Sequence, residues 1–174
     1  SSYQRVKVQN VNVEMAGLFE KDVGEVYGDG LVAGYVALKN ISFVKNIVLG
    51  NYTISAGQGL VFAKNISSTK GNDAVGQTRK KGSVISPSVS TDEFRYFQGL
   101  ATRIGSEKYS ITGFYSMRDL SASVDSNDAA TSFYTTGIYR TNNDLTRRNM
   151  LQERTVGGKI DYLFESKSTV SFNV

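Results

Sequence analysis

The chain has 174 residues and a net charge of +4, with 17 Gly, one Pro, and neither Cys nor His. This length fits about one domain. The missing residue types exclude disulfides, thiol nucleophiles, ordinary zinc or haem sites, and the common Ser-His and Cys-His catalytic arrangements. No run of about 18 apolar residues occurs, so a transmembrane helix is excluded, whereas transmembrane strands are not.

Apolar residues recur mainly with a period of two, which predicts an all-β chain. At the N-terminus, a two-residue turn at Gln9-Asn10 predicts a hairpin whose flanking valines share one face. These valines are Val6, Val8, Val11 and Val13. A charged, glycine-rich connection over residues 20–30 then leads to a strand over 31–39.

The stretch 48–56 predicts a strand with two unlike faces, because successive side chains leave a strand on opposite sides. One face carries Val48, Gly50, Tyr52, Ile54 and Ala56, and the other carries Asn51, Thr53 and Ser55. The apolar face must meet either a protein core or lipid, and we expect lipid. The following Gly57-Gln58-Gly59 continues the strand and opens no helix, which indicates a bulge or rim bend rather than a phosphate-binding loop.

Residues 65–92 and 119–151 are predicted as long polar loops, far longer than the usual connection of about 4 to 6 residues. The first contains the basic cluster Arg79, Lys80 and Lys81. This cluster is the candidate anion-contacting loop, for phosphate, lipopolysaccharide or nucleic acid, although a solvated loop is the simpler interpretation. Because no aromatic residues interleave the cluster, we do not expect nucleic acid as a partner.

The clearest hairpin spans residues 93–118. A four-residue turn would pair Ile104 with Tyr109 and bring the apolar faces of both strands together. In this register Phe114 lies opposite Gly99 and covers it.

In the last third of the chain, Thr141 with Asp144 three residues later indicates a short capped helix. Two further strands are predicted over 152–164 and 168–174. In the hairpin over 93–118, Arg95 is expected to lie opposite Arg118. Facing like charges repel, so a carboxylate or a bound anion is required nearby.

No catalytic site is predicted. Glu20, Asp22 and Glu25 lack the spacing of a calcium-binding loop and are interpreted as a solvated cluster. No carboxylate pair indicates a glycosidase or protease. We therefore expect no enzyme, no metal and no cofactor.

Two further patterns favour a membrane barrel over a soluble sheet. First, the predicted connections alternate between short and long, as in outer-membrane barrels, for strands near 3–8, 11–19, 31–39, 43–64, 93–104, 109–118, 152–164 and 168–174. Second, aromatic residues on the apolar faces gather toward strand ends, as in an aromatic girdle. These aromatics are Tyr96, Tyr109, Tyr115 and Phe164.

Four segments resemble the helix-hairpin-helix-containing outer-membrane β-barrel proteins of Gram-negative bacteria. They are LFEKDVGE (18–25), LGNYTISAGQGLVF (49–62), RKKGSVISPSVSTDEFRYFQGLA (79–101) and GIYRTNNDL (137–145). GNY…GQGL and YRT are the most specific parts. The resemblance implies an outer-membrane barrel, longer in the family than this chain, while the DNA-related helix-hairpin-helix module is absent from these residues.

The sequence therefore predicts a single domain over residues 1–174, an antiparallel up-and-down transmembrane β-barrel of about eight strands that is part of a larger barrel. The expected partners are the outer-membrane bilayer, the remainder of the barrel and other envelope proteins. The expected lumen-facing residues are Asn51, Thr53, Ser55, Arg103, Ser110, Thr112, Lys159 and Asp161. A passive pore, a transport barrel plugged by residues 65–92 and an envelope scaffold all remain open. The alternatives are a secreted soluble β-sandwich that binds a ligand through its loops, and a loop-borne hydrolase.

Overall fold

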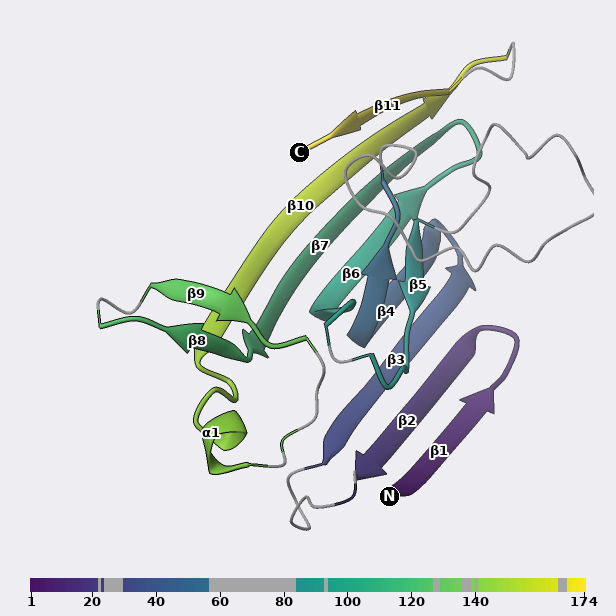
Figure 1. Ribbon diagram of the computed structural model, residues 1–174. Helices are drawn as coiled ribbons and strands as arrows, with labels where there is room; N and C mark the ends of the chain where they lie inside the picture. The colour runs from purple at the N-terminus through teal and green to yellow at the C-terminus, as the bar shows by residue number, and fades with distance from the viewer. Residues whose placement is uncertain are drawn as a thin grey trace, which may run out of the picture.

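The computed structural model is an antiparallel all-β fold with one short helix, as the sequence predicts (Figure 1). It describes residues 1–21, 23, 30–56, 84–92, 94–126, 129–135, 139, 141–165 and 169–174. Its elements are β1 (Ser2–Gln9), β2 (Val13–Lys21), β3 (Leu31–Ile41), β4 (Val44–Ile54), β5 (Ile85–Pro87), β6 (Phe97–Gly105), β7 (Tyr109–Leu120), β8 (Ala122–Val124), β9 (Ala130–Phe133), α1 (Asn142–Leu145), β10 (Leu151–Leu163) and β11 (Thr169–Asn173).

The long strands form one sheet in the order β1-β2-β3-β4-β6-β7-β10-β11, with every neighbouring pair antiparallel. These eight strands follow the predicted ones in number and order. The sheet is curved (Figure 1), but among the described residues β1 does not pair with β11. The predicted closed barrel is therefore not seen in the described part of the chain, which has a free edge at each end of the sheet.

Three short turns lie at one end of the sheet, and the β7–β10 connection lies at the other. The β1–β2, β3–β4 and β6–β7 turns mark the short-turn end (Figure 1). At the other end, the long-loop end, the β7–β10 connection contains the β8–β9 hairpin and α1. Residues 119–151 are thus not one continuous loop, because β7 continues to Leu120 and residues 122–133 pair with each other.

Helix α1 begins as predicted. The backbone N–H of Thr141 donates to the Asp144 carboxylate at 3.0 Å, and the Asp144 N–H donates to the Thr141 hydroxyl at 3.2 Å. These reciprocal bonds satisfy donors that a helix N-terminus otherwise leaves unpaired.

The hairpin registers differ from the predicted ones, although the side-chain faces stay the same. Ile104 pairs with Ile111 rather than Tyr109, because Gly105 and Ser110 form one more pair before the turn. In the first hairpin, Val8 pairs with Met15 rather than Val11. Both shifts are even numbers of residues, and the period of two therefore keeps every side chain on its face.

The core lies on one side of the sheet, which we call the enclosed face. It includes Ala37, Val48 and Ala101, all 0% exposed and consecutive in register across β3, β4 and β6. We call the opposite side the outer face. The ring of Phe114 covers Gly157 on β10, where an added Cβ would lie 2.5 Å from the ring, rather than the predicted Gly99.

Candidate functional site

The outer face carries one register row of apolar side chains that crosses seven strands. Its members are between 42% and 78% exposed, and each is paired in register with the next. They are Val8, Met15, Val36, Leu49, Leu100, Tyr115 and Val156. A soluble sheet normally covers such a row with a second layer or replaces it with polar residues.

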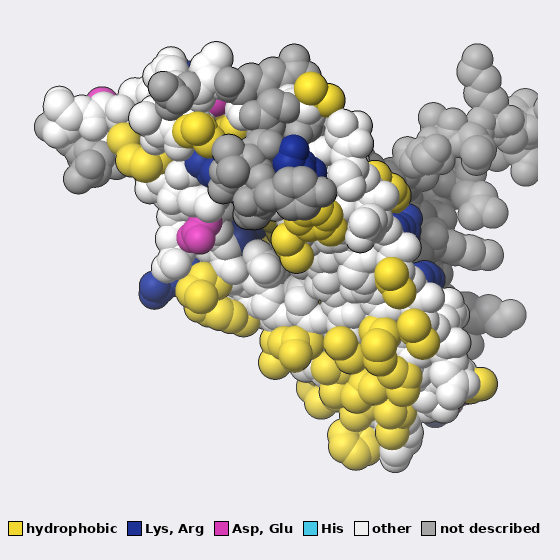
Figure 2. Space-filling model, turned by 90° about the horizontal axis from the view of Figure 1, so that it is seen from below, with side chains coloured by type: hydrophobic (Ala, Val, Ile, Leu, Met, Phe, Trp, Pro, Cys, Tyr) yellow, Lys and Arg dark blue, Asp and Glu magenta, His cyan; other side chains and the backbone are white. Residues whose placement is uncertain are grey.

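A second apolar row lies nearer the short-turn end. It consists of Ile41, Val44, Ile104, Ile111, Ile160 and Phe172. In Figure 2, the largest group of hydrophobic side chains is one broad patch, and the charged side chains visible in that view lie outside this patch. Toward the long-loop end, the outer positions of β7 and β10 become charged at Asp119 and Arg154. The outer face is therefore an apolar band with a polar margin.

Aromatic side chains gather on the outer face beside the short turns. Tyr109 and Tyr162 are paired in register and about half exposed, and the Tyr162 ring meets the Phe164 ring edge-on at 4.8 Å. Tyr115 lies in the middle of the apolar band rather than at its margin. The predicted girdle position of Tyr96 is wrong, because β6 begins only at Phe97 and the Tyr96 ring instead packs on the guanidinium of Arg118, at 5.5 Å.

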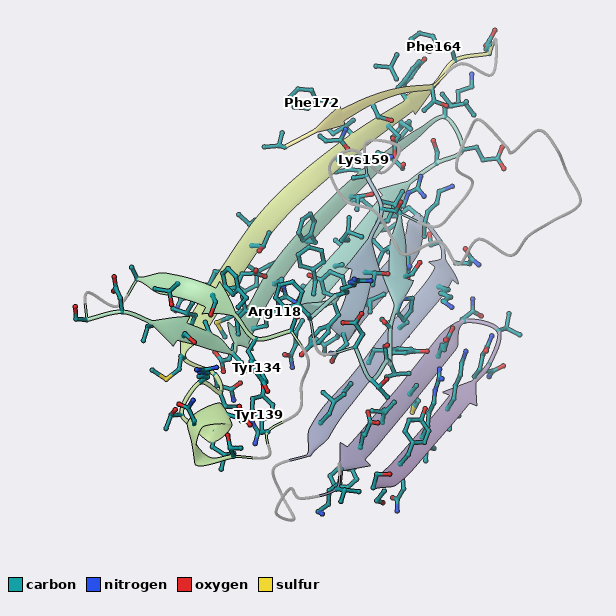
Figure 3. The ribbon with its side chains drawn as sticks, viewed as in Figure 1. Arg118, Tyr134, Tyr139, Lys159, Phe164 and Phe172 are labelled. Atoms are coloured by element: carbon teal, nitrogen blue, oxygen red, sulfur yellow. The ribbon has the colours of Figure 1, made fainter. Side chains whose placement is uncertain are left out.

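On the enclosed face, a polar row crosses six strands near the short-turn end. It comprises Lys39, Asn46, Arg103, Thr112, Lys159 and Asn173. Figure 3 shows Lys159 and Phe172 projecting from opposite sides of the β10–β11 edge. The same strands thus separate charge from apolar surface.

At one end of this row, a single carboxylate forms ion pairs with two cations. Lys159 Nζ lies 2.7 Å and Arg103 Nη2 lies 3.7 Å from the carboxylate of Asp161. The Ser171 hydroxyl donates a hydrogen bond to the same carboxylate at 2.6 Å. The Ser110 hydroxyl oxygen accepts hydrogen bonds from Nε and Nη2 of Arg103. We call Arg103, Lys159 and Asp161 the Asp161 triad.

The other end of the row has the same arrangement. The carboxylate of Glu14 on β2 contacts Lys7 from β1, at 2.9 Å, and Lys39 from β3. It also accepts the hydroxyl of Tyr35 at 2.5 Å. We call Lys7, Lys39 and Glu14 the Glu14 triad.

In both triads the cations are more exposed than the carboxylate. The side chains of Lys7 and Lys39 are 42% and 34% exposed, against 8% for Glu14. In the Asp161 triad, the side chains of Arg103 and Lys159 are 29% and 16% exposed, against 11% for Asp161. Each triad therefore carries two cations for one carboxylate, and the cations are the more exposed charges.

The long-loop half of the enclosed face is filled by aromatic and aliphatic side chains. The rings of Tyr52 and Phe97 stack at 6.0 Å, and Phe97 meets Phe114 at 5.5 Å. Nearer the short-turn end, the amide of Asn46 in the polar row donates to the carbonyl of Ile85, which places β5 over the enclosed face there (Figure 1). Aromatic side chains and β5 thus cover part of the enclosed face.

The expected orientation of residues 48–56 is wrong, because Val48, Tyr52 and Ile54 lie in the core rather than in an outward band. Gly50 has φ +104°, a backbone conformation that favours glycine, and it interrupts the alternation of the strand. Asn51 and Tyr52 are consequently both buried, although they are adjacent. Asn51 Oδ1 accepts the N–H of Gly34 at 3.2 Å and holds β4 beside β3 at this bend.

Arg118 has the carboxylate partner that its predicted position required. It forms an ion pair with Glu153, 2.9 Å away, and donates to the carbonyls of Phe94 and Tyr96. Arg95 instead lies 3.8 Å from Asp92. The two arginines are thus neutralised separately.

Five of the predicted lumen-facing residues lie together on the enclosed face. Ser110, Thr112 and Asp161 are buried there, while Arg103 and Lys159 are partly exposed. Asn51 is buried at the bend of β4, beside Gly34. Thr53 and Ser55 are half-buried beside the β5 segment. Arg79, Lys80 and Lys81 lie outside the described residues, as do Gly57-Gln58-Gly59, Asp22 and Glu25.

The sequence reasoning missed the Glu14 triad. The sequence does contain a pattern that indicates it, because Lys7 lies between Val6 and Val8, and Glu14 lies between Val13 and Met15. A charge on the polar face of each strand of a hairpin predicts a cross-strand ion pair.

Comparisons with protein-family models, with curated proteins and with solved structures find no match to this chain. Of the described residues, none forms a helix long and apolar enough to cross a membrane. The described ranges also contain no cluster of three or more acidic side chains arranged to hold a metal ion.

Proposed function

We propose that this chain forms the wall of an outer-membrane β-barrel through which solutes pass. The observation that carries the proposal is the exposed apolar row across seven strands, from Val8 to Val156. Lipid accepts such a surface without cost, whereas water does not, at about 25 cal/mol per Å² of apolar area. A charged side chain in this band would cost about 2–4 kcal/mol at the bilayer midplane.

Strand length supports the same role. A tilted strand needs about 9 to 11 residues to cross the hydrocarbon core. Six of the eight strands of the main sheet reach this length, from 9 residues in β2 and β6 to 13 in β10, whereas β1 has 8 residues and β11 has 5. The asymmetry of short turns and long connections is also the pattern of outer-membrane barrels.

A membrane barrel requires that the free edges of the sheet be paired, because unpaired backbone groups are costly in lipid. β1 and β11 run antiparallel to each other in the alternating strand order, so they are compatible with direct pairing. Additional strands of a larger barrel would also pair these two edges. We propose that the sheet closes in one of these two ways and that the bilayer is a partner of the chain.

Among the barrel functions left open by the sequence, the enclosed face favours transport. Ion pairs line its short-turn half, and the rings of Tyr52, Phe97 and Phe114 fill its long-loop half. A scaffold barrel needs neither feature. The proposed role is non-catalytic and includes no DNA-related activity.

Detergent dependence tests the proposal. The refolded protein should remain monodisperse only in detergent and should float with liposomes in a density gradient. If it stays soluble and monodisperse without detergent, the apolar band is not a lipid surface and the soluble β-sandwich is the better description.

A further inference from the structure

We propose, resting on the proposed function, that the enclosed face selects anionic solutes. The two triads carry the inference. Each places two cations around one carboxylate, so that four cationic side chains face two anionic ones. They are Lys7, Lys39, Arg103 and Lys159 around Glu14 and Asp161.

Three of these cations lie at one level of the sheet. Lys39, Arg103 and Lys159 belong to the same register row, which continues through Asn46 and Thr112. A row at one level of a curved sheet becomes part of a ring when the sheet closes. Rings of Arg and Lys are the means by which pores favour anions and phosphate groups.

The burial of the carboxylates makes the field at this level positive. Glu14 and Asp161 lie beneath their cations and are hydrogen-bonded by hydroxyl groups of the wall, Tyr35 and Ser171 respectively. A solute in the enclosed space would therefore meet ammonium and guanidinium groups first. Small inorganic anions and the carboxylate or phosphate groups of organic solutes are the class that this surface attracts.

A cation of either triad can be substituted while its carboxylate keeps other partners. Replacing Arg103 leaves Asp161 with Lys159, Ser110 and Ser171, and replacing Lys39 leaves Glu14 with Lys7 and Tyr35. Neither carboxylate is left alone, so the charge of the row can be changed without an isolated buried anion.

The test is the reversal potential of the purified protein in planar bilayers under a KCl gradient. For the unmodified protein, the sign of the reversal potential should indicate a preference for chloride over potassium. In the double variant Lys39→Gln/Arg103→Gln, the reversal potential should fall to zero or change sign. Lys39→Arg/Arg103→Lys, which keeps both charges, should retain the chloride preference. Lys108→Gln, in the exposed β6–β7 turn, is the matched control and should leave the potential unchanged.

Liposome flotation of the same preparations separates the two proposals. Protein that inserts and conducts with potassium preference, or whose potential does not respond to the double variant, overturns the anion inference while the barrel stands. Protein that inserts without conducting also overturns it. Protein that does not float with liposomes contradicts the proposed function and removes the basis of this inference.

Discussion

The two faces of the sheet share every strand but follow opposite rules. On the outer face, neighbouring strands place valine, leucine, isoleucine and aromatic side chains in register and leave them exposed. On the enclosed face, the same strands bury small and aromatic residues at one end and ion pairs at the other. A water-soluble antiparallel sheet instead leaves polar side chains on its exposed face. The contrast between the two faces therefore supports the proposal that the outer face meets an apolar environment.

The largest effect is expected for Tyr52→Ala, at the centre of the enclosed aromatic cluster. Tyr52 is 0% exposed, and its hydroxyl donates to the carbonyl of Tyr115 at 2.7 Å. Removing a buried aromatic side chain costs about 3–5 kcal/mol. Urea unfolding in detergent measures the loss, and Tyr109→Ala on the outer face should cost much less. Equal losses would contradict the division into two faces.

The next effect is expected for Leu100→Arg in the apolar row. Leu100 is 47% exposed, so a soluble sheet would tolerate arginine there with little change. In a bilayer the substitution should cost about 2–4 kcal/mol and reduce the yield of protein folded into liposomes. Ser106→Arg, in the exposed β6–β7 turn, is the control. Indistinguishable yields for the two variants would mean that Leu100 does not meet lipid.

A smaller effect is expected for Asp161→Asn on the enclosed face. The amide retains a hydrogen-bond acceptor for Ser171 but leaves Lys159 and Arg103 without their shared counter-charge. Loss of charge-assisted hydrogen bonds in a partly buried site costs about 1–3 kcal/mol. Glu165→Gln, whose side chain is 92% exposed, should be nearly neutral in the same unfolding assay. A neutral Asp161→Asn would show that the triad is dispensable for folding.

The smallest effect is expected for Thr141→Ala, which lies outside both faces and gives a baseline. The hydroxyl of Thr141 caps α1, and its removal should lower the local stability of this helix by about 1 kcal/mol. Hydrogen exchange at the Asp144 amide should rise while exchange in β7 and β10 stays constant. Faster exchange throughout the sheet would mean that α1 supports the fold as a whole.

The sequence predicts the strands well because alternation is a local property. Eight strands, their order and the Thr141–Asp144 cap follow from spacing alone. The side of the sheet to which residues 48–56 point does not follow, because Ile47 and Leu49 beside Val48 are also apolar and Gly50 breaks the period. Such a choice is made by the partners in register, here Ala101 for Val48 and Leu100 for Leu49.

The candidate site is predictable where a charge interrupts an alternating pattern. Arg103, Lys159 and Asp161 are found in this way, and their convergence requires only that β6, β7 and β10 be neighbours. Asn46 reaches across to Ile85 on β5, a contact between residues 39 positions apart that no local spacing indicates. Closure of the sheet is likewise a property of its edges and not of any single strand.

Spin-label accessibility at single cysteines tests the central claim most directly, and the absence of native Cys makes the labelling specific. Labels at Leu100→Cys and Val156→Cys on the outer face, and at Lys39→Cys and Arg103→Cys on the enclosed face, are compared in liposomes. We predict that oxygen dissolved in lipid relaxes the outer labels and a water-soluble nickel complex relaxes the enclosed ones. Outer labels that are relaxed by the nickel complex and not by oxygen would contradict the assignment of lipid to the outer face.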